Sequence, residues 1–182
     1  DPNEQSAQVR EATQFLQPLI TGPDGTWPSP WTPCQRAIAL GLARIHVRYA
    51  EGGPEYCRQL LTAVLAEPGE GDGSWQAAAR ELLAEALLTQ GKISEAAELT
   101  QQIPDGFLPM VDLIERAASI LRHPDEPKGT AIARLVLQWA DRLDSGRGGL
   151  DEAVQRRIDR ARAVASAQLG DRVAALALYA RL

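Results

Sequence analysis

The chain has 182 residues, 45% of them hydrophobic and 24% charged, so it can bury a core and is too apolar to be disordered throughout. Its net charge of −5 argues against a general nucleic-acid binder, which usually presents a basic face. No apolar run approaches the ~18 residues of a membrane-spanning helix. We therefore expect neither a nucleic-acid partner nor insertion into a membrane.

The first segment, residues 1–32, is expected to cap the fold with one helix and a loop. Apolar residues recur at helical spacing from 4 to 17, and Pro18 should kink or stop this helix because it lacks an amide donor. The following stretch, up to Pro33, holds four prolines and two glycines, which is typical of an irregular loop. Trp27 and Trp31 lie in this loop. They either form a ligand platform or pack the loop onto the helices, and packing is the more frequent role of such rings.

Four helical hairpins are predicted after this cap. Apolar side chains at helical spacing, interrupted by turn residues, place the hairpins at 33–67, 74–103, 107–143 and 151–182. The most regular stripe runs from Ile132 to Leu143 and includes Trp139, which we expect in the core. Ser74 and Asp151 are expected to cap the helices that follow them. No segment alternates with a period of two, so the sequence predicts an all-α single domain of about nine helices.

Glycines recur at intervals of roughly 40 residues, which is typical of a helical-hairpin solenoid; they are Gly53, Gly91, Gly129 and Gly170. Two stretches carry a more specific pattern, namely Leu83-Ala84, Leu87, Gly91 and Ala96, and then Ala163, Gly170, Ala175 and Tyr179. This pattern resembles the tetratricopeptide repeat family. The resemblance is good over 76–103 and 156–182, looser over 36–66 and 110–143, and absent from 1–32. It implies a right-handed α-solenoid of antiparallel helix pairs, whose concave groove binds a peptide or another protein domain.

The same resemblance implies which side chains face that groove, since in the family they come from the first helix of each hairpin. The corresponding positions here are Arg44 and Arg48, Glu81 and Glu85, Asp112, Glu115 and Ser119, and Arg157, Arg160 and Val164. Such a groove is acidic in its centre and would select a protein or peptide partner with basic residues. The alternative is that these charges form a solvated face. The groove hypothesis predicts that Glu81→Lys with Glu115→Lys abolishes partner binding without lowering thermal stability.

Residue types that perform catalysis or bind metals are scarce. His46 and His123 fall in different hairpins without adjacent ligands, and the chain has no common nucleophile, metal or phosphate-loop motif. We therefore expect no enzymatic activity, no metal and no cofactor. Cys34 and Cys57 are expected to be buried, reduced and too far apart for a disulfide.

Two charged clusters each allow two interpretations. Glu67, Glu70 and Asp72 share a glycine-rich loop but lack the closing carboxylate of a calcium loop, so a solvated connector is favoured. Five arginines near the last hairpin could bind phosphate, although an exposed helix face with local ion pairs is favoured. These are Arg147, Arg156, Arg157, Arg160 and Arg162.

The leading expectation for function is a non-enzymatic scaffold for protein–protein interaction. The alternatives are a regulatory or oligomerisation segment of a larger protein and, third, an all-helical enzyme. Val173, Leu176 and Tyr179 make the last helix apolar with no polar helix after it, so either it is amphipathic enough alone or further protein or a partner covers it. That partner includes a second copy in a homo-oligomer. No secretory leader is visible, and we favour the cytoplasm over the cell envelope.

Overall fold

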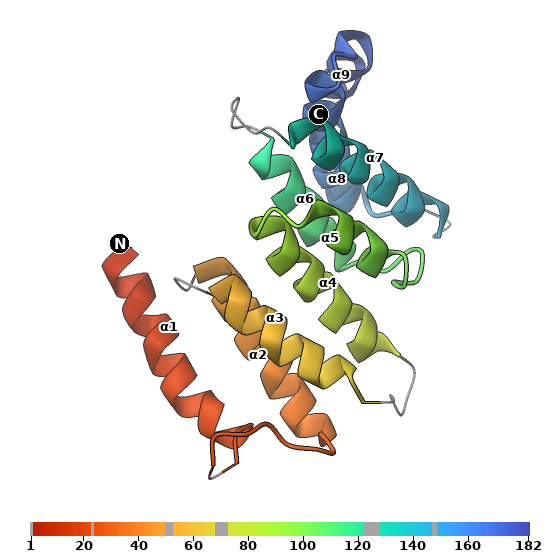
Figure 1. Ribbon diagram of the computed structural model, residues 1–182. Helices are drawn as coiled ribbons and strands as arrows, with labels where there is room; N and C mark the ends of the chain where they lie inside the picture. The colour runs from red at the N-terminus through yellow and green to blue at the C-terminus, as the bar shows by residue number, and fades with distance from the viewer. Residues whose placement is uncertain (1, 23, 50–52, 68–72, 122–127, 147–148) are drawn as a thin grey trace. The chain divides into compact units, whose positions relative to one another are not determined.

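The computed structural model describes residues 2–22, 24–49, 53–67, 73–121, 128–146 and 149–182 (Figure 1). These residues form nine α-helices and one short 3₁₀ helix, and no strand occurs among them. They belong to two compact units, Asp1–Gln90 and Gly91–Leu182. The all-α class predicted from the sequence is confirmed, and each unit is described by itself.

The first unit packs four α-helices in chain order. Helix α1 ends just before the 3₁₀ helix that contains Pro18, as the missing amide donor predicts. Helix α2 contacts α1, α3 and α4, and α3 contacts α4 as well. Small and branched side chains such as Ala39, Leu42 and Ala43 form the buried side of α2, which lets its neighbours approach closely. The bounds are α1 Pro2–Leu16, α2 Pro33–Tyr49, α3 Gly53–Leu65 and α4 Ser74–Thr89, with the 3₁₀ helix at Gln17–Leu19.

The second unit repeats this order of packing. Helices α6, α7 and α8 all contact one another, α9 contacts α8, and α5 contacts α7. In both units the first helix of a hairpin therefore touches its own partner and the first helix of the next hairpin. The bounds are α5 Ile93–Thr100, α6 Met110–Ile120, α7 Gly129–Ser145, α8 Glu152–Gln168 and α9 Arg172–Tyr179.

The predicted hairpins at 33–67, 107–143 and 151–182 correspond to α2 with α3, α6 with α7, and α8 with α9. The predicted hairpin at 74–103 spans the boundary between the units at Gln90, so its helices α4 and α5 are described separately.

The four recurring glycines are not structurally equivalent. Gly91 and Gly170 have φ angles of 72° and 83° in the tight turns before α5 and α9, a region that L side chains rarely occupy. Gly129 instead begins α7 and has no positive φ. Gly53 likewise begins a helix, α3. The regularly spaced glycines therefore have two different roles: two lie in turns and two begin helices.

Of the two predicted helix caps, one is confirmed and one is wrong. The carboxylate of Asp151 accepts a hydrogen bond of 2.7 Å from the amide of Ala153, which confirms it as the cap of α8. The prediction for Ser74 is wrong, because Ser74 is the first residue of α4 and Gly73 occupies the cap position with a φ of 75°. A glycine in this conformation lets the chain enter the helix without a side-chain cap.

Trp139 is only 1% exposed, which confirms its predicted place in the core. Its indole Nε1 donates a 2.9 Å hydrogen bond to Thr100 Oγ1 and so links α7 to the end of α5. Arg142, one turn later, donates to the carbonyls of Thr100 and Ile103 and contacts Asp105 Oδ1 at 2.7 Å. The segment after α5 is therefore held on α7 by both apolar burial and satisfied backbone carbonyls.

Both cysteines are free, as predicted, but only one is buried. The Cys57 thiol donates to the Ala43 carbonyl at 3.0 Å between α3 and α2. The expectation that Cys34 is buried is wrong, since Cys34 lies exposed in the first turn of α2. The first turn of a helix can project beyond its neighbours, so an apolar residue type there does not ensure burial.

We expect Gly146→Ala to destabilise the second unit by about 1–3 kcal/mol, measured by urea denaturation. The φ of Gly146 is −81°, which suits any residue, but an added Cβ would overlap the backbone of Asp105 and Gly106. The control is Gly41→Ala within α2, where no other part of the chain lies within 4 Å of the new Cβ. That control should be neutral or stabilise by about 0.5–1 kcal/mol. Equal effects of the two substitutions would contradict the close approach at Gly146.

Candidate interaction surfaces

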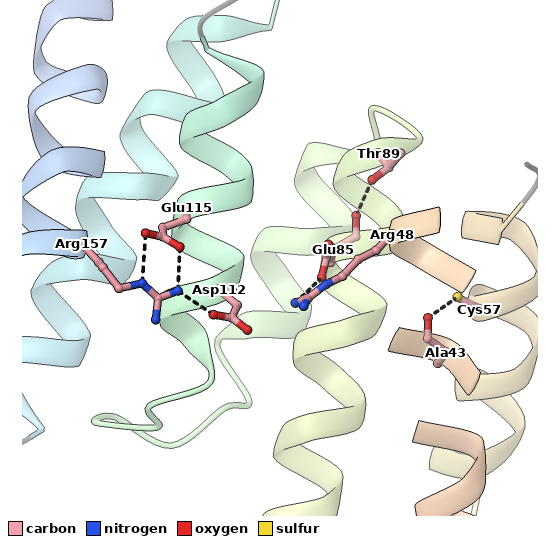
Figure 2. A network of polar contacts seen from close by, with 8 residues as sticks. All are labelled: Ala43, Arg48, Cys57, Glu85, Thr89, Asp112, Glu115 and Arg157. Carbon is pink, nitrogen blue, oxygen red and sulfur yellow. Dashed lines mark hydrogen bonds and ion pairs between the residues drawn. The ribbon is translucent and has the colours of Figure 1, made fainter. Parts of the chain in front are cut away.

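Helices α2 and α4 of the first unit carry opposite charges that form an ion pair. Arg48 on α2 approaches Glu85 on α4, with Arg48 Nη2 3.5 Å from Glu85 Oε2, as Figure 2 shows. The Glu85 side chain is only 2% exposed. Its charge also acts on the nearby thiol of α3: burial, with a smaller contribution from Glu85, raises the pKa of Cys57 to about 12. Cys57 is consequently a neutral packing residue at physiological pH.

The second unit contains a similar pairing with shorter contacts. Arg157 on α8 binds both carboxylate oxygens of Glu115 on α6, with Nε–Oε1 at 3.0 Å and Nη2–Oε2 at 2.6 Å (Figure 2). Its Nη2 also lies 2.8 Å from Asp112 Oδ1. Hydrogen bonds to these two carboxylates raise the pKa of Arg157 further above its usual value. The three side chains are between 37% and 44% exposed, so solvent screens the pairing.

The residues assigned to the groove therefore divide into three groups. Arg48 with Glu85, and Arg157 with Asp112 and Glu115, are brought together as ion pairs inside a unit. Arg44 and Arg160 are exposed. Glu81 is 1% exposed. This burial reverses the expectation that Glu81→Lys leaves thermal stability unchanged, because the substitution would bury an ammonium group.

The tryptophan loop is fixed to the first unit by polar contacts. The Trp31 amide donates to Glu67 Oε2 at 2.8 Å, Glu67 lies 3.7 Å from Arg36 Nη2, and the Arg36 guanidinium stacks 4.6 Å from the centre of the Trp75 ring. The Trp31 amide is the main cause of a lowered pKa of Glu67. Since Trp31 is only 4% exposed, its ring serves packing, whereas Trp27 is half-buried.

These contacts correct the view of Glu67 as part of a solvated connector. The other two carboxylates of that loop, Glu70 and Asp72, lie outside the described residues, as do His123 and Arg147.

Three arginines of the C-terminal cluster are already engaged by carboxylates. Arg156 pairs with Glu152 one turn earlier on α8. Arg162 reaches from α8 to α7, where it lies 2.8 Å from Asp141 and 2.7 Å from Asp144. Only Arg156 makes the local, exposed ion pair that the sequence favoured; Arg162 and Arg157 instead bind carboxylates of the neighbouring helices α7 and α6.

Helix α1 is held on α2 by His46. The Thr13 hydroxyl donates to the Val9 carbonyl at 2.7 Å, so at 2.9 Å its oxygen accepts a hydrogen bond from His46 Nε2. The imidazole also packs against Tyr56, with 4.4 Å between ring centres. Burial lowers the pKa of His46. Nearby, a shallow open depression of about 590 Å³ lies along α1 and the following loop, bordered by Gln14, Gln17, Thr21 and Gly25 among others.

The largest exposed apolar surface of the second unit lies on α9. Val173 is 81% exposed, Leu176 69%, Tyr179 48% and Leu182 40%. We call Val173, Leu176 and Tyr179 the outer face of α9; Leu182 lies three residues beyond the end of the helix. This helix packs on α8 through Ala175, which is 4% exposed. Helix α9 is thus apolar on both sides, and its only charged residue is Arg172.

Comparison with known proteins gives no relative: no family model matches the chain, and neither the curated proteins nor the solved structures include a match. Among the described residues, no group of three or more His, Cys, Asp or Glu side chains could hold a metal ion. No helix in the described part of the chain is long and apolar enough to cross a membrane.

We expect Glu81→Lys to destabilise the protein by about 3–5 kcal/mol, because it replaces a buried carboxylate with a longer cation. The matched control is Glu98→Lys on the exposed side of α5, which should change the free energy of unfolding by less than about 0.5 kcal/mol. Urea denaturation measures both. Similar stabilities of the two variants would show that Glu81 lies at the surface.

The first unit should lose stability as the pH falls below 6.5, the ordinary pKa of histidine, towards the lowered folded-state pKa of His46. In this range His46 takes up a proton in the unfolded chain but stays neutral in the folded chain, so acid favours unfolding. Urea midpoints at pH 8 and pH 5 are compared for the wild type and His46→Gln, which retains no titrating ring. We expect the variant to lose less stability between pH 8 and pH 5 than the wild type. Equal losses of stability would show that His46 does not cause the pH dependence.

Proposed function

We propose that this protein is a non-enzymatic protein-interaction module and that the outer face of α9 is its docking surface. The observation that carries the proposal is the exposure of Val173, Leu176 and Tyr179 on one side of a single short helix. An exposed apolar patch of this kind commonly marks a site where another protein binds.

The neighbouring hairpins support this assignment. The second helix of an earlier hairpin is covered by the first helix of the next one: α3 packs on α4, and α7 packs on α8. Helices α5 and α6 also contact α7, and Ile132, Val136 and Trp139 on its apolar stripe are each at most 2% exposed. Helix α9 is also a second helix, and no other described helix of the second unit packs on its outer face. A helix that is apolar on both sides is normally buried on both.

The order of packing supports a helical-hairpin solenoid as the architecture. We propose that it has the right-handed superhelix that the resemblance to tetratricopeptide arrays implies. We favour the outer face of α9 over the groove formed by the first helices for a physical reason. In the first unit Arg48 pairs with Glu85, and in the second unit Arg157 pairs with Asp112 and Glu115. A charged ligand would have to compete with these ion pairs.

The test compares the wild type with Val173→Ser combined with Leu176→Ser. Both side chains are exposed, so the double variant should keep its thermal midpoint while losing the protein that co-purifies with the wild type from its native cells. Phe15→Ser is the control, because Phe15 is 74% exposed on α1. An identical set of co-purifying proteins for all three chains would contradict the proposal.

A further inference from the structure

We propose that α1 is a detachable helix, which leaves α2 when His46 takes up a proton, while α2, α3 and α4 stay folded. Acid thereby controls access to the side of α2 that α1 covers. The contact that couples the two events is the hydrogen bond between Thr13 and His46. The inference concerns the first unit alone and does not depend on the docking surface proposed on α9.

Helix α1 has few contacts with the rest of the first unit, and it lies at the edge of that unit in Figure 1. It contacts only α2 and the short 3₁₀ helix that follows it, whereas α2, α3 and α4 each contact at least two α-helices. Of its side chains from residue 7 to residue 16, only Val9 is buried. Local opening requires less free energy where few apolar contacts are lost, so α1 can open without unfolding its neighbours.

His46 is the side chain of α2 that links α1 to the rest of the unit. Its Nε2 donates to Thr13 Oγ1 at 2.9 Å, and its ring packs on Tyr56 of α3 with 4.4 Å between ring centres. The Tyr56 hydroxyl is buried and has no hydrogen-bond partner among the described residues. This contact therefore includes a polar group that would gain a hydrogen bond on contact with water.

A proton on His46 disfavours the closed state through burial and leaves the hydrogen bond to Thr13 in place. The Thr13 hydroxyl donates to the Val9 carbonyl, so Nε2 already carries a hydrogen and the added proton goes to Nδ1. The resulting imidazolium is half-buried, and burial is the cause of the lowered pKa of His46. When α1 leaves, water reaches the ring and its pKa rises towards the ordinary 6.5. Acid therefore favours the open state.

The titratable groups that α1 and α3 present do not compensate for this charge. Arg10 and Glu11 of α1 are exposed. Tyr56 and Cys57 of α3 are neutral at physiological pH, since burial raises the pKa of each. No carboxylate of the described chain forms an ion pair with His46, so the buried imidazolium has no counter-charge there.

The charged groups farther along α3 and on α4 are engaged elsewhere. On α3, Glu55 pairs with Arg58 one turn later. On α4, Glu85 pairs with Arg48. None of these groups contributes to the lowered pKa of His46, for which burial alone is responsible.

Hydrogen–deuterium exchange of the full chain at pH 7.5 and pH 5.5, corrected for the intrinsic pH dependence of exchange, tests the proposal. We expect the opening of residues 7–16 to increase about two- to tenfold at pH 5.5, while α3 and α4 keep their protection. Tenfold is the upper limit, because an exposed imidazole with a pKa of 6.5 is about nine-tenths protonated at pH 5.5.

Two variants test the role of the contact. His46→Gln should make the opening of α1 independent of pH, while the control His123→Gln, which removes the other histidine of the chain, should leave the acid response unchanged. Thr13→Val removes the hydrogen bond and should increase the opening of α1 at both pH values. The comparison of α1 with α3 is made in the wild type, so it does not depend on the folding of any variant.

Three results would overturn the proposal. The first is an opening of α1 that does not change between pH 7.5 and pH 5.5. The second is an equal acceleration of exchange in α1, α3 and α4, which would show that acid unfolds the whole unit and does not release one helix. The third is an acid response of α1 that persists in His46→Gln, which would assign the proton to another group.

Discussion

The burial of apolar side chains between consecutive helices is the interaction on which the rest of this structure depends. A short helix is marginal in isolation and becomes stable when a neighbour covers its apolar stripe. In this chain α2 is covered by α3 and α4, and α6 by α7 and α8, so each hairpin relies on the next. The outer face of α9 is a stripe of the same kind, and no other described helix of the second unit covers it.

Charge has a second, narrower role, which is to fix how neighbouring helices are aligned. Arg162 joins α8 to α7, and Arg157 joins α8 to α6, each through two carboxylates. Exposed pairs of this type contribute little free energy, but their directionality favours one register of two apolar surfaces over others. Five of the charges assigned to the ligand groove are paired within a unit, which is why we propose the apolar surface of α9 as the main recognition element.

Much of the fold follows from local sequence signals. Helical periodicity, Pro18 and the turn glycines at 91 and 170 predict the helices and their order, and the cap at Asp151 follows from a one-residue rule. Burial is harder to predict because it depends on which elements lie nearby. Glu81 is 1% exposed on α4, whereas Cys34 projects at the start of α2. The resemblance to tetratricopeptide repeats implies that Arg48, Glu85, Asp112, Glu115 and Arg157 share one surface, but the sequence alone does not show that they bind one another.

The central claim is that partners dock on α9 and not along the first helices of the hairpins. Hydrogen–deuterium exchange of the full chain, alone and with its co-purified partner, tests this claim most directly. The account predicts that bound partner slows amide exchange in residues 172–182 and in the end of α8 beside them, while α2 and α6 are unaffected. Slower exchange in α2 and α6, with unchanged exchange in α9, would contradict the account and assign binding to the groove.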